Sequence, residues 1–242
     1  MELTILMPCL NEEKSLGNCI REAREFIERW GIQGEILISD NGSRDHSCRT
    51  ALDLGARVIQ ARTPGYGAAL RAGIDAASGD YVIMGDCDGS YDFTAIGPML
   101  TLLREGADLV VGNRFAGGIE KGAMPWIHRY AGVPFLSFLG RMVGRTCVRD
   151  FHCGIRGVNR ERFQELGASS TGMEFASEMI VLASMAGQRI REAPVPLRVD
   201  KREGRSHLRS IPDGLRHIRL LLGLWLRPLR GRRGGRGRPN SS

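Results

Sequence analysis

Residues 81–92, YVIMGDCDGSYD, are the stretch that decides the fold. An apolar run from Tyr81 to Met84 leads into two aspartates, Asp86 and Asp88, with a glycine on either side of the pair. Magnesium and manganese take oxygen ligands, so two carboxylates after a buried strand are typical of a metal site completed by a substrate diphosphate. Asp and Gly are also ordinary turn residues, and the stretch alone leaves a plain polar turn equally open.

An alternation of apolar runs and helical spacing surrounds this stretch. The predicted strands are Leu3–Met7, Glu35–Ser39, Arg57–Gln60, Tyr81–Met84 and Asp108–Gly112, and the predicted helices are Glu12–Trp30, Arg44–Leu54, Ala68–Ala77 and Phe93–Glu105. Ser43 or Asp45 is expected to cap the second helix, and Asp92 the fourth. Strands that alternate with helices through short links predict an α/β fold with a doubly wound, mostly parallel, Rossmann-like sheet.

Four links between these elements are expected to meet at one crevice. Ligands of such sheets bind beyond the carboxyl ends of the strands, where the strand order reverses. The links there are residues 8–12, 40–43, 63–67 and 86–92, each rich in Asn, Asp, Ser or Gly. Polar loops are common, which explains any one of them, but the four together favour a nucleotide pocket.

The pattern changes after Arg114. Residues 115–125 are rich in glycine and predict a lid or acceptor loop. Further helices are predicted at 126–143, 172–186 and 212–226, with short strands at 189–192 and 195–199 separated by Pro194. The last helix is amphipathic, with Leu215, Ile218, Leu222 and Leu226 on one side. We expect a domain of residues 1–210, an amphipathic helix at 211–228 and an Arg- and Gly-rich disordered tail at 229–242.

The positive charge of the chain is concentrated in that tail. The net charge is +7, and six arginines lie in the last sixteen residues, so the remainder carries about +1. This balance argues against a nucleic-acid-binding fold and for a local anionic contact, with a membrane surface or RNA, or for a merely solubilising end. The final helix could dock on the protein or lie on a membrane while the tail reaches anionic lipid.

The cysteines predict a reduced, cytoplasmic protein, and the final helix with its Arg-rich tail predicts peripheral contact with the inner face of the membrane. Positions 9, 19, 48, 87, 147 and 153 lack the spacing of a disulfide scaffold or a zinc site. Cys147, His152 and Cys153 lack a fourth ligand and are interpreted as structural. Glu2–Met7 is a short strand rather than the apolar core of a signal peptide, and no apolar run reaches the ~20 residues that span a bilayer.

Five motifs, in order, resemble the family 2 glycosyltransferases of GT-A fold, and within them the dolichol- or polyprenyl-phosphate sugar transferases. The motifs are Ile5–Glu12, Ser39–Ser43 with Asp45, Gly65–Leu70, Gly79–Tyr81 leading to Asp86–Asp88, and Gly112–Phe115. Arg129, Cys153–Arg156, the pair Glu174 and Glu178, and Arg202–Ser206 extend the resemblance to about residues 2–210. Asn41, Tyr66 and Ser90 depart from it, since the family usually has aspartate, lysine and glutamine there.

The resemblance implies inverting transfer of a sugar from a UDP- or GDP-linked donor to a polyprenyl phosphate, with Mg²⁺ or Mn²⁺ on Asp86 and Asp88. The residues it implies for the donor are Pro8, Leu10, Asn11, Glu12, Asp40, Asn41, Gly67, Asp86, Cys87, Asp88 and Arg202. Arg114 and Arg129 match positions assigned to the acceptor phosphate. With the short Ser90 side chain, the metal could keep an extra water.

The acceptor decides whether the reaction needs a base. A lipid phosphate is already ionised, whereas a hydroxyl needs a general base, for which Glu174, Glu178 and Asp150 are candidates. A surface salt bridge would equally explain Glu174, Glu178 and Arg129. The alternatives are a soluble transferase acting on a small-molecule or natural-product hydroxyl, a nucleotidyltransferase, which the acidic and glycine-free segment 8–13 disfavours, and a non-catalytic RNA- or membrane-binding module.

Overall fold

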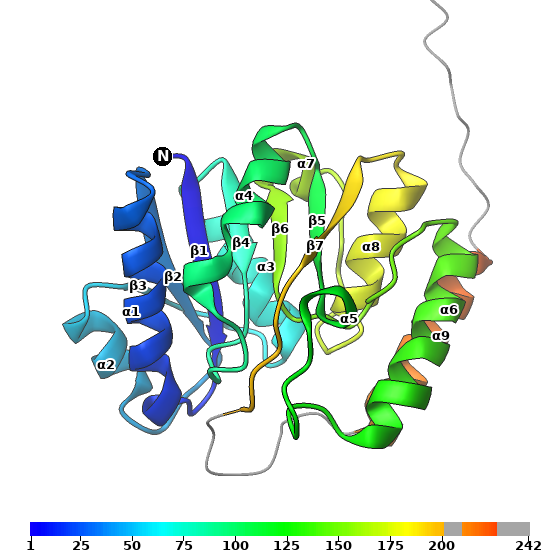
Figure 1. Ribbon diagram of the computed structural model, residues 1–242, viewed down its shortest axis with the longest axis horizontal. Helices are drawn as coiled ribbons and strands as arrows, with labels where there is room; N and C mark the ends of the chain where they lie inside the picture. The colour runs from blue at the N-terminus through cyan, green and yellow to red at the C-terminus, as the bar shows by residue number, and fades with distance from the viewer. Residues whose placement is uncertain (201–209, 227–242) are drawn as a thin grey trace, which may run out of the picture.

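The computed structural model describes residues 1–200 and 210–226. Its centre is a seven-stranded sheet in the order β3-β2-β1-β4-β6-β5-β7 (Figure 1). The strands are β1 (Leu3–Cys9), β2 (Gly34–Asp40), β3 (Arg57–Gln60), β4 (Tyr81–Met84), β5 (Leu109–Asn113), β6 (Arg156–Asn159) and β7 (Ile190–Pro194). All neighbours run parallel except β6, which is antiparallel to β4 and β5. The predicted α/β fold with a mostly parallel sheet is confirmed.

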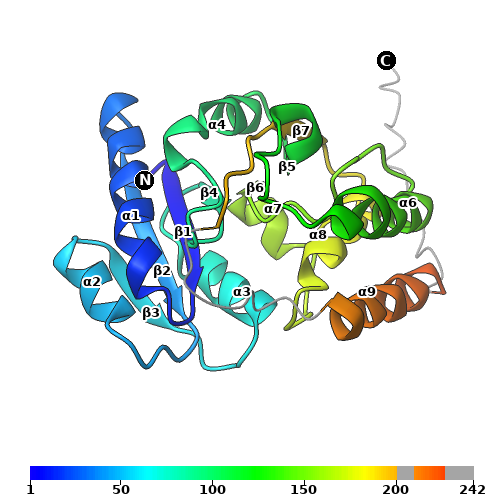
Figure 2. The ribbon, with the colours of Figure 1, turned by 60° about the horizontal axis from the view of Figure 1, so that its bottom comes forward.

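The central strands have continuous apolar sequences because helices cover both faces of the sheet. Leu3, Ile5, Leu6 and Met7 of β1 are all fully buried. In Figures 1 and 2, α1 (Glu13–Arg29) and α4 (Gly97–Arg104) cover one face, and α3 (Tyr66–Ala76) covers the other. The remaining elements are α2 (Ser47–Asp53), η1 (Phe93–Ala95), α5 (Arg114–Gly117), η2 (His128–Gly132), α6 (Val133–Gly144), α7 (Arg160–Gln164), α8 (Phe175–Met185) and α9 (Ser210–Trp225).

Strand β6 was not predicted from the sequence. Its residues, RGVN, offer only one apolar side chain, and tertiary contacts hold it instead. The Arg156 guanidinium donates to the carbonyls of Cys153 at 2.9 Å, Phe151 at 2.6 Å and Ala176. A Cβ at Gly157 would lie 2.9 Å from Leu103 Cδ1, so only glycine lets α4 approach the strand this closely.

Two predicted helices are shorter in the structure. The predicted helix Phe93–Glu105 is divided into η1 and α4, and Asp92 caps η1 as expected by accepting from the Thr94 backbone N–H at 2.9 Å. The predicted helix Arg44–Leu54 begins only at Ser47. The backbone N–H groups of Arg44 and His46 instead donate to Asn11 Oδ1 at 2.8 Å and to Glu13 Oε2 at 3.2 Å.

The first of the two strands predicted around Pro194 extends to that residue, where β7 ends, and the second, 195–199, is not a strand of the sheet. Pro194 is the last residue of β7 and lies opposite Asn113 of β5. A proline is tolerated there since β7 is an edge strand, which needs no ladder hydrogen bond on its outer side. Beyond it, Leu197 forms an isolated parallel bridge with Ile119.

Helices α6 and α9 lie together at the end of the molecule opposite α2 (Figures 1 and 2). The predicted helix 126–143 is divided into the π-helical turn η2 and α6. Helix α9 packs on α6 and α8, and buries His217, Leu221 and Leu224. Leu215 and Leu222, from the predicted apolar stripe, are 62% and 55% exposed. The stripe that is visible in the sequence is therefore not the face that docks.

Candidate active site

Hydrogen bonds connect the first two predicted loops at the carboxyl edge of the sheet. Asn11, after β1, accepts from the backbone N–H of Arg44 at 2.8 Å, and its own N–H donates to Ser43 Oγ at 2.9 Å. Asn11 has a positive φ of 56°, a conformation that asparagine tolerates better than most residues. Glu12 is buried, and its N–H donates to Ser47 Oγ at 2.9 Å.

Hydrogen bonds stabilise the second loop and connect it to the third. Asp40, buried at the end of β2, accepts from the backbone N–H of Gly42 at 3.0 Å and of Ser43 at 3.2 Å. Asn41 donates to the Thr63 carbonyl at 2.8 Å and accepts from the Gly65 N–H at 2.7 Å. Asn41, which departs from the family pattern, therefore shapes the loop before α3 through its amide.

Tyr66 connects the third loop to the aspartate pair. Its hydroxyl donates to Asp86 Oδ1 at 2.9 Å. Burial, reinforced by the negative charge of Asp86, raises the pKa of Tyr66 well above its usual value, so the phenol stays protonated and remains a donor. The sequence marked Tyr66 only as a substitute for lysine and did not predict this role.

Asp88 is buried, and its loop turns sharply. Oδ1 of Asp88 accepts from the Ser90 backbone N–H at 2.9 Å and from Ser90 Oγ at 2.6 Å. Gly89 between them has φ +82°, a conformation that favours glycine. Cys87, also buried, donates its thiol to the Pro8 carbonyl at 3.2 Å and so joins the loop to β1. The predicted metal loop is therefore fixed by its own side chains and by the neighbouring strand.

The chemistry of Asp86 and Asp88 fits a divalent metal that a diphosphate helps to hold. Both are carboxylates after the same strand, and hard cations prefer such oxygen donors. In residues 1–200 and 210–226, no group of three or more His, Cys, Asp or Glu side chains could hold a metal. Two protein carboxylates, with waters and substrate phosphates, are the set that Mg²⁺ usually takes.

The two arginines predicted for the acceptor lie in different environments. Arg114 begins α5, is 8% exposed and forms a buried ion pair with Asp150. Arg129 lies in η2, where its guanidinium carbon is 5.5 Å from the centre of the Tyr130 ring. Burial opposes the charge of Arg114, but Tyr91 and Asp150 outweigh it and raise the pKa of the guanidinium. Arg114 is therefore firmly cationic.

The two predicted glutamates differ as well. Glu178 is 4% exposed and accepts from the backbone N–H groups of Ser169 at 3.0 Å and Ser170 at 2.8 Å, so it holds the loop before α8. Glu174 accepts through Oε1 from the Gly172 N–H at 3.2 Å. Its Oε2 is buried and has no hydrogen-bond partner among the described residues. Of the two, Glu174 is the one that keeps a carboxylate oxygen without a donor among the described residues.

The loop before α8 also closes on the start of α3. The Ala68 N–H donates to the Thr171 carbonyl at 3.2 Å. A Cβ on Gly67 would lie 2.5 Å from Phe175 Cβ and 2.6 Å from the Ser170 carbonyl oxygen. Gly67 thus permits close packing of two segments that are a hundred residues apart. Of the other predicted donor residues, Pro8 lies within β1 and Leu10 directly after it, while Arg202 lies outside the described residues.

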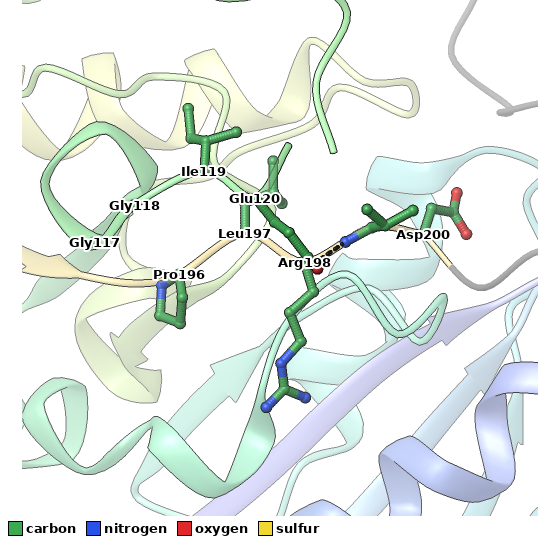
Figure 3. Close-up of a pocket in the computed structure, with 9 residues that line it drawn as sticks. Gly117, Gly118, Ile119, Glu120, Pro196, Leu197, Arg198 and Asp200 are labelled. Atoms are coloured by element: carbon green, nitrogen blue, oxygen red, sulfur yellow. Dashed lines mark hydrogen bonds between the residues drawn. The ribbon is translucent and has the colours of Figure 1, made fainter. Parts of the chain in front are cut away.

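Arg198 joins the aspartate loop to the segment after β7, and the sequence did not predict it. Its backbone N–H donates to the Ser90 carbonyl at 2.9 Å, and its guanidinium pairs with Glu22 at 3.1 Å and with Asp92. Beside it, a cavity of about 780 Å³ lies between the glycine-rich residues 117–120 and residues 196–200 (Figure 3). The Val199 N–H donates to Glu120 Oε2 at 2.9 Å, and both residues line this cavity.

The fold and this edge of the sheet define a glycosyltransferase of GT-A fold. The family model for glycosyl transferase family 2 matches residues 4–167, and the chain belongs to that family. A solved structure with the same fold is glucosyl-3-phosphoglycerate synthase from Mycobacterium tuberculosis, crystallised with Mn²⁺, UDP and glucosyl-3-phosphoglycerate. It has a TM-score of 0.71 and 21% identity, and the match covers 94% of this chain and 81% of that one.

Two relatives from Haloferax volcanii are similar in sequence. The low-salt glycan biosynthesis hexosyltransferase Agl6 is 40% identical over 222 residues, which are 91% of this chain but only 53% of that protein. The chain therefore spans about half of this relative. A dolichyl-phosphate hexose transferase is 29% identical over 214 residues, 88% of this chain and 89% of that protein.

Proposed function

We propose that this enzyme uses a divalent metal and transfers a hexose, with inversion, from a nucleotide diphosphate sugar to a polyprenyl phosphate. The observation that carries the proposal is the hydrogen-bonded series of four loops at one sheet edge, which ends in Asp86 and Asp88. Asn11, Asp40 and Asn41 order the first three loops around the space a nucleoside would take. The Haloferax hexosyltransferase and dolichyl-phosphate hexose transferase support the hexose and the acceptor class.

The residues on this edge have separable roles. Asp86 and Asp88 would hold Mg²⁺ or Mn²⁺, which as a Lewis acid stabilises the charge on the leaving diphosphate by several kcal/mol. Tyr66 and Ser90 orient the two carboxylates by donating to one oxygen of each. Arg129, and Arg202 in the segment outside the described residues, would bind phosphate oxygens, for which the planar guanidinium is suited.

An exposed apolar surface supports the lipid acceptor and contact with an anionic membrane. It is formed by side chains of residues 126–142 and of α9 that are half exposed or more: Trp126, Ile127, Tyr130, Phe135, Phe138, Met142, Leu215, Leu222, Trp225 and Leu226. Scattered apolar side chains are normal, but large apolar patches mark interaction surfaces, and these side chains gather on two neighbouring segments, since α6 packs against α9. The six arginines that follow in the sequence would add attraction to anionic lipid. In the described residues, no helix has the length and apolar character needed to span a bilayer.

The donor and metal assignment is tested by binding. UDP and GDP sugars should raise the melting temperature in Mn²⁺ or Mg²⁺, because a ligand that binds only the folded state stabilises it by mass action. The shift should vanish with chelator and in Asp88→Ala. If no nucleotide sugar stabilises the protein, or if Asp88→Ala binds the metal and nucleotide unchanged, the assignment is wrong.

A second candidate acceptor is a small-molecule hydroxyl, and two observations favour it. Arg114 is paired with Asp150, which compensates the charge that a lipid phosphate would need. Glu174 keeps a buried carboxylate oxygen without a partner among the described residues, as a general base requires. Incubation with a labelled donor sugar distinguishes the two acceptors. Label that is extracted into organic solvent together with polyprenyl phosphate supports the lipid acceptor. Label on a water-soluble product that is lost in Glu174→Gln supports the hydroxyl acceptor.

The proposed membrane contact is tested with vesicles. The protein should sediment with anionic vesicles more than with neutral ones, and Trp126→Ala with Trp225→Ala should reduce sedimentation without changing nucleotide binding. Equal sedimentation of this variant and the parent protein would contradict the role of the apolar surface. Cytoplasmic location stays a prediction from the cysteine pattern.

A further inference from the structure

Two cysteines meet beneath the aspartate loop. β1 and β4 pair in parallel up to Leu6 opposite Met84, and Cys9 and Cys87 each follow three residues further along their segments. The Gly85 N–H donates to the Leu6 carbonyl at 3.0 Å, which extends the ladder in this direction. The Cys87 thiol donates to the Pro8 carbonyl at 3.2 Å, which brings its sulfur to the residue directly before Cys9.

The two thiols are in contact. Both side chains are 2% exposed, and the two thiols hydrogen-bond to each other. The contact with Cys87 lowers the pKa of Cys9, against the effect of burial. Ser43 Oγ, 3.9 Å from the Cys9 sulfur, and Ser47 also favour the Cys9 thiolate, whereas Asp40 opposes it. Cys9 is therefore favoured as a thiolate, the nucleophilic form of a thiol.

We propose that an oxidant of the peroxide class joins Cys9 and Cys87 in a reversible disulfide that switches off binding at the aspartate loop. The Cys9 thiolate attacks one peroxide oxygen, the O–O bond breaks, and the released hydroxide takes the Cys9 proton to form water. The Cys87 sulfur then attacks the resulting sulfenic acid, and its hydroxide leaves with the Cys87 proton as a second water. The two thiols lose two electrons, the peroxide gains them, and a thiol reductant reverses the reaction.

The position of Cys87 makes the bond consequential. Asp86 and Asp88 are its immediate neighbours in the chain, and the Cys87 thiol now donates to Pro8. A disulfide requires a sulfur–sulfur distance of about 2.05 Å, much shorter than a thiol hydrogen bond. The loop must therefore shift toward β1 and lose the Pro8 contact. The effect on metal and nucleotide rests on the proposed function, whereas the disulfide itself does not.

The test uses the full chain, reduced and then treated with hydrogen peroxide. Free thiols are alkylated, and the digest is mapped by mass spectrometry without reduction. Mn²⁺ with UDP, and with GDP, is titrated into reduced, oxidised and re-reduced protein, with circular dichroism to verify the fold. We expect a Cys9–Cys87 peptide, at least tenfold weaker nucleotide binding after oxidation, and recovery with dithiothreitol. Cys9→Ala should form no such peptide and keep the affinity of its own reduced form.

Cys147→Ala is the matched control, since Cys147 is exposed and should leave the oxidation response as in the parent chain. The proposal is overturned if Cys9 is oxidised without a link, if Cys87 links to Cys19 instead, or if the Cys9–Cys87 link leaves binding unchanged. If the reduced protein binds neither nucleotide, the proposed donor site fails, and the peptide map still decides whether the disulfide forms.

Discussion

The guanidinium of Arg114 is bound by both carboxylate oxygens of Asp150, through Nε–Oδ2 and Nη2–Oδ1 distances of 2.7 Å each. The backbone N–H of Arg114 donates to the same Oδ2 at 3.1 Å, and Asp150 is fully buried. A bidentate pair of this kind is geometrically specific and strong. The residue predicted to bind an acceptor phosphate thus fixes the start of α5 to the segment before β6.

Asp150→Ala should strongly destabilise the fold. Removing one partner leaves Arg114 as a buried, uncompensated charge, which typically costs about 3–5 kcal/mol. Denaturation in urea measures the loss. Asp53→Ala is the matched control, because its pair with Arg49 spans 3.7 Å between side chains that are 70% and 81% exposed. The control should change the free energy of unfolding by less than about 1 kcal/mol, and an equal effect of both substitutions would contradict the buried pair.

Gly67→Ala should also destabilise, although alanine favours helices. The new Cβ would meet Phe175 and the Ser170 carbonyl at 2.5 and 2.6 Å, and such overpacking costs about 1–3 kcal/mol. Gly223→Ala in α9 meets nothing within 4 Å and should be neutral or stabilise by up to about 1 kcal/mol. Thermal unfolding of the two variants decides. A stabilised Gly67→Ala would refute the close approach of α3 to the loop before α8.

Tyr66→Phe should weaken metal-dependent nucleotide binding more than it affects stability. It removes the hydroxyl that donates to Asp86, and the loss of such an orienting hydrogen bond typically weakens a metal site 10–100-fold. Titration of Mn²⁺ with UDP or GDP measures the change. Tyr130→Phe is the control, because Tyr130 is 60% exposed, and this variant should bind Mn²⁺ and nucleotide as the parent protein does. If Tyr66→Phe binds Mn²⁺ and nucleotide with unchanged affinity, Tyr66 does not contribute to the site.

His152 should make stability fall with acid. Its ring centre lies 4.7 Å from that of His217, which in turn bonds Ser177 Oγ at 2.9 Å, and Nε2 of His152 is buried without a partner among the described residues. Burial, followed by the charges of His217, Arg156 and Arg114, holds the pKa of His152 well below its usual value of 6.5. His152 therefore stays neutral in the folded state at a pH, below about 6.5, at which it is protonated in the unfolded chain.

The sign follows from that difference. Since the unfolded state binds more protons, the free energy of unfolding decreases as the pH falls from about 6.5 toward the folded pKa, by up to about 1.4 kcal/mol per pH unit for one proton. His152→Gln should lose less stability than the parent protein between pH 7.5 and 5.5, as measured by urea denaturation. His46→Gln, at an exposed position, should keep the parent's dependence. Identical slopes in all three proteins would assign the acid sensitivity elsewhere.

Much of the fold could be predicted from local pattern. β1, β4 and β5 are apolar because both faces of the sheet are covered. The alternation of strands and helices can also be read from short stretches of sequence. β6 carries no such signal, since Arg156 and Gly157 belong in a strand only where carbonyls surround the guanidinium and Leu103 packs on the glycine. The docking face of α9 could not be predicted for a similar reason. The helix carries apolar side chains on two sides, and only its packing on α6 and α8 selects the side that is buried.

The sequence by itself determined the class of sheet, and it predicted the edge at which ligands bind and the pair Asp86 and Asp88, because strand periodicity and the polar links after strands are encoded within a few residues. Tertiary structure alone decided which polar side chains orient the site and which ones build the scaffold. Tyr66 reaches Asp86, Arg198 reaches Ser90, and Arg114 is bound by Asp150. These partners are 20 to 108 residues apart in the numbering, so they become neighbours only when the sheet assembles, and burial then sets their charge.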